Sequence, residues 1–305
     1  MADASITADA WGLRAAHARL RPLSYVAVLI TVLTMAAAMA GGPQLYSLLG
    51  PGIDDGSLSA MAYDRAVFYA ATIGPFYLVA LTMLAIERRP WAPDHLDPVV
   101  AAMVGAALGL AGVGAALVVT NVAGVLTVGP PVTPLSSGLI GVGLGAVLVG
   151  VQVTGQELFF RGWLQPVLAY RLGRPMGLVF TALLFAGMEG IGASPTPFAL
   201  LNQVLAGLVL GLLALRTGGL AAPIAAHFAW RWVEQSWLGL IPNPGYDPLG
   251  SLFDWTLAGP ASWSGGTEGL TGGRGTTAAL LCMTSLALIW RPGQAWQAAS
   301  QALRR

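Results

Sequence analysis

The chain has 305 residues, of which 55% are hydrophobic and only 10% are charged, whereas soluble domains typically carry roughly 25% charged residues. This composition excludes an ordinary soluble domain and predicts an integral protein of the lipid bilayer. Fifteen basic and fourteen acidic residues leave a net charge of +1, so the chain lacks the basic surface that a nucleic-acid partner requires. The single cysteine, Cys282, excludes an internal disulfide and a cysteine-based metal cluster.

Long apolar segments follow one another along the chain, and a bilayer core about 30 Å thick takes about 20 such residues per helix. They predict an all-α, polytopic membrane helix bundle with about eight transmembrane helices. The first segment also fits a cleaved signal peptide, although about 22 residues is a long charged region before one. The predicted segments cover residues 23–40, 66–86, 98–120, 138–158, 176–190, 198–215, 220–238 and 276–290.

The arginines predict the orientation, because loops on the cytoplasmic side carry most of the positive charge. With both termini in the cytoplasm, most arginines fall on that side, while Arg65 and Arg274 lie outside and Arg231 lies within a span. The chain has no lysine and is rich in Ala, Gly and Leu. This bias suggests a GC-rich genome and a bacterial inner (plasma) membrane. The predicted cytoplasmic arginines are Arg14, Arg19, Arg21, Arg88, Arg89, Arg161, Arg171, Arg174, Arg216, Arg291, Arg304 and Arg305.

Outside the predicted spans, two loops of some length, at 41–65 and 240–275, are expected to cap the outer face. The predicted organisation is a cytoplasmic N-terminal segment, N-terminal membrane helices, a core, an outer Gly/Pro-rich loop, and a last helix with a cytoplasmic tail. These parts correspond to residues 1–22, 23–137, 138–240, 241–275 and 276–305.

Glycines at close helical spacing predict tight helix packing, because small residues let membrane helices approach each other. One set is Gly105, Gly109 and Gly112, and another is Gly207 and Gly211. No internal repeat with paired, interrupted spans is visible, which disfavours a transporter. A transporter remains a distant alternative.

The stretch TGQELFFRG carries Gln156, Glu157 and Arg161 at the predicted end of the fourth segment. Glu157 and Arg161 are four residues apart and share a helix face, while Gln156 lies about 100° round the helix. Glu157 and Arg161 are either part of a functional site or an ion pair at the end of the helix, in which Arg161 reaches the membrane surface. Glu189, in LFAGMEG, would have to be paired or protonated if it is buried.

Three ionisable residues, His227, Arg231 and Glu234, lie at positions i, i+4 and i+7 of the seventh segment. Such a stripe inside a span predicts a polar cavity or a partner helix, and ionisable groups within membranes are usually functional. Together with Gln156 and Glu189, the stripe favours a site inherited from a catalytic function over a set of isolated polar residues in the core.

The order of these stretches resembles the type II CAAX prenyl endopeptidases and their bacteriocin-processing relatives, the CPBP or Abi intramembrane proteases. The resemblance covers roughly Val151 to Leu238. The family pattern EExxxR, FxxxH and HxxxN or HxxxD reads here QELFFR, FAGME and HFAWR. It implies a CAAX-protease-like core, with three helices around a cavity open to the cytoplasm, and cleavage of a membrane-protein or peptide substrate.

The resemblance also implies roles for individual residues. Glu157, Arg161, Phe185 and His227 match the family pattern. Gln156 stands where the family has the general base, Glu189 where it has the first histidine, and Arg231 where it has the asparagine. An amide cannot take a proton from water at neutral pH, so loss of proteolysis is expected.

Two hypotheses follow from these replacements. In the first, Glu189 and Arg231 form a buried ion pair that closes the former active site, and the protein is a pseudoenzyme that binds or scaffolds a membrane protein. In the second, catalysis is retained with Glu157 or Glu189 as the base and Arg231 as an oxyanion donor. A Zn²⁺ site would then use Glu157, Glu189 and His227, although the charge of Arg231 opposes a metal cation.

Overall fold

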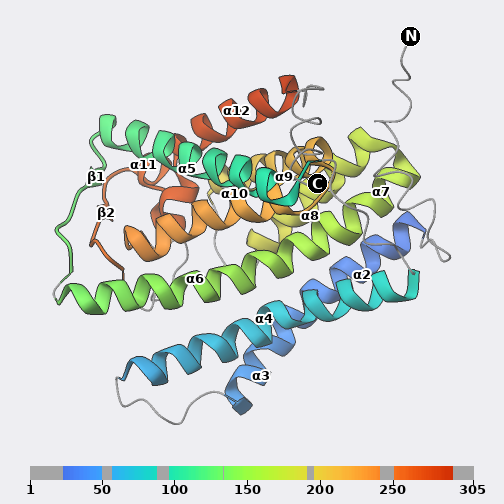
Figure 1. Cartoon of the computed structure of the whole chain (residues 1–305), viewed down its shortest axis with the longest axis horizontal. Coiled ribbons are helices and arrows are strands. Elements are labelled where there is room, and N and C mark those ends of the chain that lie inside the picture. Colours follow the sequence, from blue (N-terminus) through green and yellow to red (C-terminus); the bar gives the residue numbers. More distant parts are fainter. Residues whose placement is uncertain are drawn as a thin grey trace.

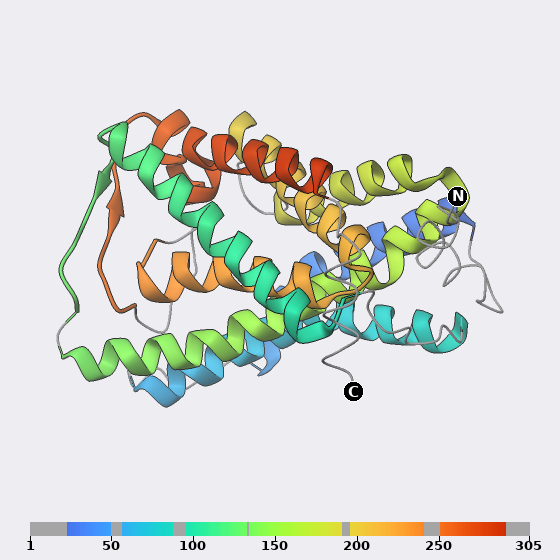
Figure 2. The ribbon, with the colours of Figure 1, turned by 45° about the horizontal axis from the view of Figure 1, so that its top comes forward.

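The computed structural model describes residues 23–49, 57–87, 96–132, 134–190, 196–240 and 251–290. The predictions for residues 1–22 and 291–305, and for the first part of the Gly/Pro-rich loop, lie outside these described residues. Within them the chain is an all-α membrane helix bundle, as predicted, with one short β ladder (Figures 1 and 2).

The N-terminal half forms three long helical segments and the first strand. Its elements are α2 (Ser24–Ala36), η1 (Ala37–Gly41), α3 (Gly42–Leu49), α4 (Leu58–Glu87), α5 (Pro98–Val122) and β1 (Leu126–Thr127). The predicted loop at 41–65 is therefore wrong at both ends, because the first helix continues through a π-helical turn to Leu49 and α4 already begins at Leu58.

The next part of the chain contains the helices that resemble the protease core. Its elements are α6 (Leu135–Glu157), η2 (Leu158–Leu164), α7 (Gln165–Leu172), α8 (Arg174–Gly190), α9 (Pro197–Thr217), α10 (Ala221–Trp232) and η3 (Val233–Trp237). The predicted end of the fourth segment at residue 158 is wrong, because α6 runs through the π-helical η2 into α7 without a break. TGQELFFRG is therefore in the middle of a continuous helix.

The C-terminal part contains β2 (Thr256–Leu257), α11 (Ala261–Ser264), η4 (Gly266–Gly272) and α12 (Arg274–Ile289). β2 pairs antiparallel with β1, with Leu257 opposite Leu126, at one end of the bundle (Figure 2). The described part of the predicted outer loop is thus folded structure, and its η4 segment is buried against the helices.

Five helical segments are long and apolar enough to cross a membrane: 24–49, 59–87, 98–122, 135–172 and 197–217. The chain is therefore a multi-pass membrane protein. The described residues also form helices at the other three predicted spans, but α8, α10 with η3, and α12 have fewer than 18 residues each. For these three, membrane crossing stays a prediction.

Local signals explain where two of the helices begin and end. Asp97 caps α5 by accepting hydrogen bonds from the backbone N–H groups of Val99 and Val100, and Pro98 occupies the first helical position, where its missing N–H costs nothing. α9 begins with Thr196 and Pro197 in the same way and ends at Gly218, whose φ of 76° is left-handed.

The predicted packing role of the glycines is confirmed. α5 packs closely against α10, and a Cβ atom on Gly105 would lie 2.1 Å from the carbonyl oxygen of Ala222. A Cβ atom on Gly109 would lie 2.3 Å from the carbonyl oxygen of Ala226. Gly207 of α9 packs against Ala182 of α8 in the same way. Glycine is therefore needed on α5 for α10 to take its position.

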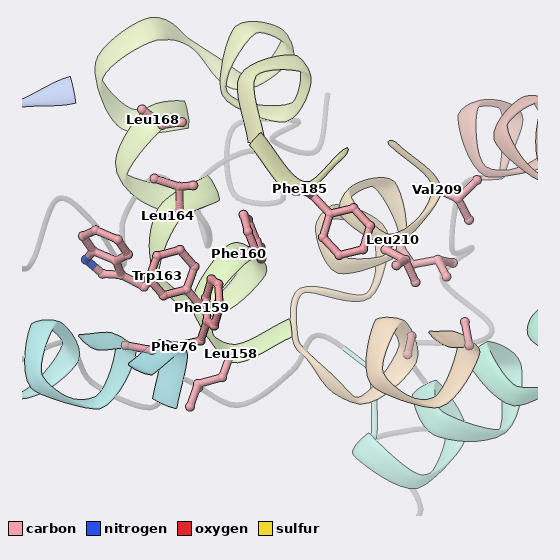
Figure 3. Packing of buried hydrophobic residues seen from close by; sticks show 14 of the residues in the cluster. Phe76, Leu158, Phe159, Phe160, Trp163, Leu164, Leu168, Phe185, Val209 and Leu210 are labelled. Carbon is pink, nitrogen blue, oxygen red and sulfur yellow. The ribbon is translucent and has the colours of Figure 1, made fainter. Parts of the chain in front are cut away.

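The largest hydrophobic cluster surrounds η2 (Figure 3). Phe76 of α4 packs edge-to-face on Phe159, with ring centroids 5.1 Å apart, and Phe160 packs in the same manner on Phe185 of α8 at 5.4 Å. The aromatic side chains that follow Glu157 thus connect α4 to α8 and fix η2 between them.

Candidate functional site

The six predicted site residues converge in the bundle. Gln156 and Glu157 are the last two residues of α6, Arg161 lies in η2, Glu189 lies in α8, and His227 and Arg231 lie in α10. All six side chains are buried or nearly so. They form two hydrogen-bonded groups that start from the neighbouring residues Glu157 and Gln156.

In the first group, Glu157 Oε1 accepts a hydrogen bond from Arg161 Nη1 at 2.9 Å and lies 2.9 Å from His227 Nδ1. Arg161 Nη2 also donates to the backbone oxygen of Gly207 at 3.2 Å. An ionised Glu157 accepts from the histidine, so Nδ1 carries the proton and Nε2 of a neutral imidazole is left as an acceptor.

Phe185 holds the first group from the side of α8. The guanidinium carbon of Arg161 lies 4.3 Å from the centroid of its ring, and the His227 ring lies 5.9 Å from it, edge-on. This cation–π contact in a buried setting adds to the ion pair with Glu157. Four residues that match the family pattern therefore form one packed unit.

In the second group, Glu189 receives hydrogen bonds on both carboxylate oxygens. Gln156 Nε2 donates to Glu189 Oε1 at 2.7 Å, and Arg231 Nη2 donates to Glu189 Oε2. The predicted buried ion pair between Glu189 and Arg231 is thus present. The three residues that depart from the family pattern contact one another and link α6, α8 and α10.

The alternative interpretation of Glu157 and Arg161, an ion pair at a helix end, is wrong. Both side chains have an exposed fraction of 0%, because η2 continues the helix and the aromatic cluster covers it. Arg161 therefore does not reach the membrane surface, and it no longer counts among the loop arginines that set the predicted orientation.

The three predicted zinc ligands are not brought together as a set: Glu157 contacts His227, but Glu189 belongs to the other group. Glu157 Oε1 is bonded to Arg161 and His227, while Glu189 faces Arg231 and Gln156. Among the described residues, no group of three or more His, Cys, Asp or Glu side chains is arranged to hold a metal ion. Two arginines beside the two carboxylates also oppose a cation, so these residues do not fit a Zn²⁺ site.

Glu234, the third member of the predicted stripe, lies outside both groups. It is fully buried and accepts a hydrogen bond from the Thr271 hydroxyl at 3.2 Å. Thr271 belongs to η4. Asn202 also holds this segment, because its side-chain Nδ2 donates hydrogen bonds to the backbone oxygens of Thr271 and Gly273 at 2.7 and 3.0 Å. The stripe thus faces a folded-back segment as well as the other helices.

Two residues near the second group were not predicted from the sequence. Tyr69 of α4 is buried and interacts electrostatically with Arg231 and Glu189. Glu268 of η4 interacts with the same two residues, and burial raises its pKa above the usual 4.5 while Arg231 lowers it. A lone tyrosine in an apolar segment and a glutamate in a Gly-rich loop carry no sequence signal that would have marked them.

A cavity of about 50 Å³ lies beside His227 and Arg231, between α9, α10, η4 and α12. Phe185, which packs against Phe160 in the aromatic cluster, lines one part of it, and apolar side chains such as Val209, Leu280 and Met283 form most of the rest of its wall. The site therefore has an internal space next to the retained histidine.

The polytopic helix bundle thus holds a buried Glu–Arg–His unit between the α6–η2 segment and α10, at the positions that the resemblance to intramembrane proteases implies. Residues 136–233 match the family model described as type II CAAX prenyl endopeptidase Rce1-like. This region is therefore similar to the CPBP intramembrane proteases, and it contains all six predicted site residues. No curated protein and no solved structure matched the chain.

Proposed function

We propose that this protein is a CPBP-family member that does not cleave peptide bonds and that its site instead binds a segment of a membrane protein. The observation that carries the proposal is that both carboxylate oxygens of Glu189 already accept hydrogen bonds, from Gln156 and Arg231. Peptide hydrolysis needs a group that takes a proton from water. The described contacts leave neither Gln156 nor Glu189 in that role.

The chemistry of Gln156 supports the loss of activity. A carboxamide has no basic lone pair at neutral pH, so Gln156 cannot replace a catalytic carboxylate. General-base catalysis is typically worth about 10²- to 10⁴-fold in rate. We also infer that Glu157 is not a substitute, because its Oε1 is bonded to both Arg161 and His227, and these contacts favour the charged carboxylate over one that takes up a proton.

The retained architecture supports a binding role. Arg161, Phe185 and His227 keep the packed unit around Glu157, and a cavity lies next to it. A preformed space between helices can bind a polypeptide segment without any chemical step. Orientation in the membrane and the cytoplasmic position of both termini remain part of the proposal.

Reversal of the three substitutions tests the proposal. Wild-type protein and the variant Gln156→Glu/Glu189→His/Arg231→Asn are purified in detergent and incubated with a fluorogenic peptide library. We expect cleavage by the triple variant only. The matched control adds His227→Ala to the triple variant and should abolish that cleavage. Wild-type protein that cleaves as fast as the triple variant would refute the proposal.

A further inference from the structure

The cavity beside His227 and Arg231 contains a polar side chain that the site described above does not use. Six polar side chains line the cavity, and five of them are bonded elsewhere. Asn202 holds η4, Thr271 donates to Glu234, and Thr276 donates to the backbone oxygen of Leu270 at 2.7 Å. His227 contacts Glu157 and Arg231 contacts Glu189. The polar lining consists of Asn202, Gln203, His227, Arg231, Thr271 and Thr276.

Gln203 is the exception. Its exposed fraction is 6%, it lines the cavity, and within the described part of the chain its amide has no hydrogen-bond partner. The neighbouring residue Asn202 is fully buried and uses both ends of its amide, since its Oδ1 accepts from the Thr277 hydroxyl at 2.7 Å. Buried amides are normally hydrogen-bonded, so an unpaired one in a cavity wall is suited to a ligand.

We propose that this cavity binds an uncharged ligand group with one hydrogen-bond donor and one acceptor, namely a peptide group of the bound membrane segment, and that Gln203 recognises it. The inference rests on the proposed binding function, and it adds the chemical group that is bound and the residue that forms a hydrogen bond with it. The Gln203 amide can donate to the carbonyl oxygen of a peptide group, and Nε2 of His227 can accept its N–H.

Charge and size favour this ligand group. Arg231 is already neutralised by Glu189, and Glu157 by Arg161, so a charged ligand would enter without a free counter-charge. A volume of about 50 Å³ corresponds to about four water-sized spheres of 10–15 Å³ each. This matches a group of a few heavy atoms flanked by apolar walls.

The test uses N-methylacetamide, which consists of a peptide group and two methyl groups, and full-length protein in detergent. Binding is measured by saturation-transfer NMR of the probe and by the affinity from its titration. Methyl acetate is the matched probe, because it keeps the carbonyl and replaces the N–H by oxygen. Acetate and methylammonium test for a charged ligand instead.

Two variants locate the binding site. Gln203→Leu removes the amide, and Ala206→Leu on the same helix fills the cavity while leaving Gln203 in place. Gln44→Leu, at an exposed position of α3, is the matched control. We expect the affinity for N-methylacetamide to fall about tenfold in the first variant, which is the upper range for one hydrogen bond, and to be lost in the second.

The outcomes separate this inference from the proposed function. Equal binding of methyl acetate and N-methylacetamide, preferential binding of either ion, or unchanged affinity in Gln203→Leu would each overturn the inference. So would unchanged affinity in Ala206→Leu, which keeps the test decisive if Gln203→Leu does not fold. None of these results depends on proteolysis, which the triple variant tests separately.

Discussion

His227 Nδ1 lies 2.9 Å from Glu157 Oε1, and this contact joins α10 to the end of α6 across 70 residues of sequence. The same oxygen holds Arg161. One carboxylate thus positions both the retained histidine and a fully buried arginine. The order and packing of the site therefore depend on this carboxylate.

Glu157→Gln is expected to destabilise the protein strongly, because it leaves the Arg161 charge buried without its counter-ion. Removing one partner of a buried pair typically costs about 3–5 kcal/mol. SDS-induced unfolding in mixed micelles measures the change. The double variant Glu157→Gln/Arg161→Met removes both charges and should recover most of the loss. A double variant less stable than Glu157→Gln would contradict this account.

Gln156→Glu alone is expected to destabilise the site, because it places a second carboxylate against Glu189, which is now 2.7 Å from Gln156 Nε2. Two carboxylates at that distance repel each other unless one takes up a proton. The exchange Gln156→Glu/Glu189→Gln restores one donor and one acceptor between the two positions, but it moves the carboxylate away from Arg231, so it should recover only part of the stability. A double-mutant cycle without coupling between the two positions would argue against the contact.

Reversing one charge of the Glu189–Arg231 pair is expected to destabilise the protein, and reversing both charges is expected to restore stability. Glu189→Arg and Arg231→Glu each place like charges together, whereas the double reversal restores the attraction. The double variant should therefore express and unfold closer to wild type than either single variant. If both single variants extract and unfold like wild type, the ion pair has no role in holding α8 to α10.

Gly109→Ala is expected to push α10 away from α5, because the new Cβ atom would lie 2.3 Å from the carbonyl oxygen of Ala226, next to His227. Overpacking of this kind typically costs about 1–3 kcal/mol. Gly114→Ala on the same helix is the control, since nothing lies within 4 Å of its Cβ position. The control should be neutral or stabilising, by up to about 1 kcal/mol. Equal effects of the two substitutions would exclude the packing explanation.

The buried carboxyl group of Glu268 is expected to make the stability of the protein depend on pH. Burial raises the pKa of Glu268 above 4.5, so the folded state favours the protonated carboxyl. Its contribution to stability is present below the unfolded pKa and is lost as the pH rises through the folded pKa. Wild-type protein should therefore lose stability relative to Glu268→Gln as the pH rises from about 4 to about 8. A difference in melting temperature that stays constant with pH would oppose this assignment.

The sequence by itself determined the class of fold and most of the site. Apolar segments of bilayer length require helices, because unpaired backbone groups are costly in lipid, and each predicted segment contains a helix. The spacing of Glu157, Arg161, His227 and Arg231 placed them on shared helix faces. Opposite charges at Glu189 and Arg231 predicted their pairing, which the structure contains.

Only the tertiary structure decided which atoms meet. The contact of Gln156 with Glu189, the burial of Arg161 under Phe185, and the packing of Gln203 into the cavity wall depend on how α6, α8, α9 and α10 are placed. Periodicity fixes the side of a helix on which a residue lies, but not the residue it faces on another helix. The glycines of α5 and the aromatic side chains of η2 set these distances through close packing. Packing between segments far apart in the sequence produces no local sequence pattern, so it could not be predicted from the sequence.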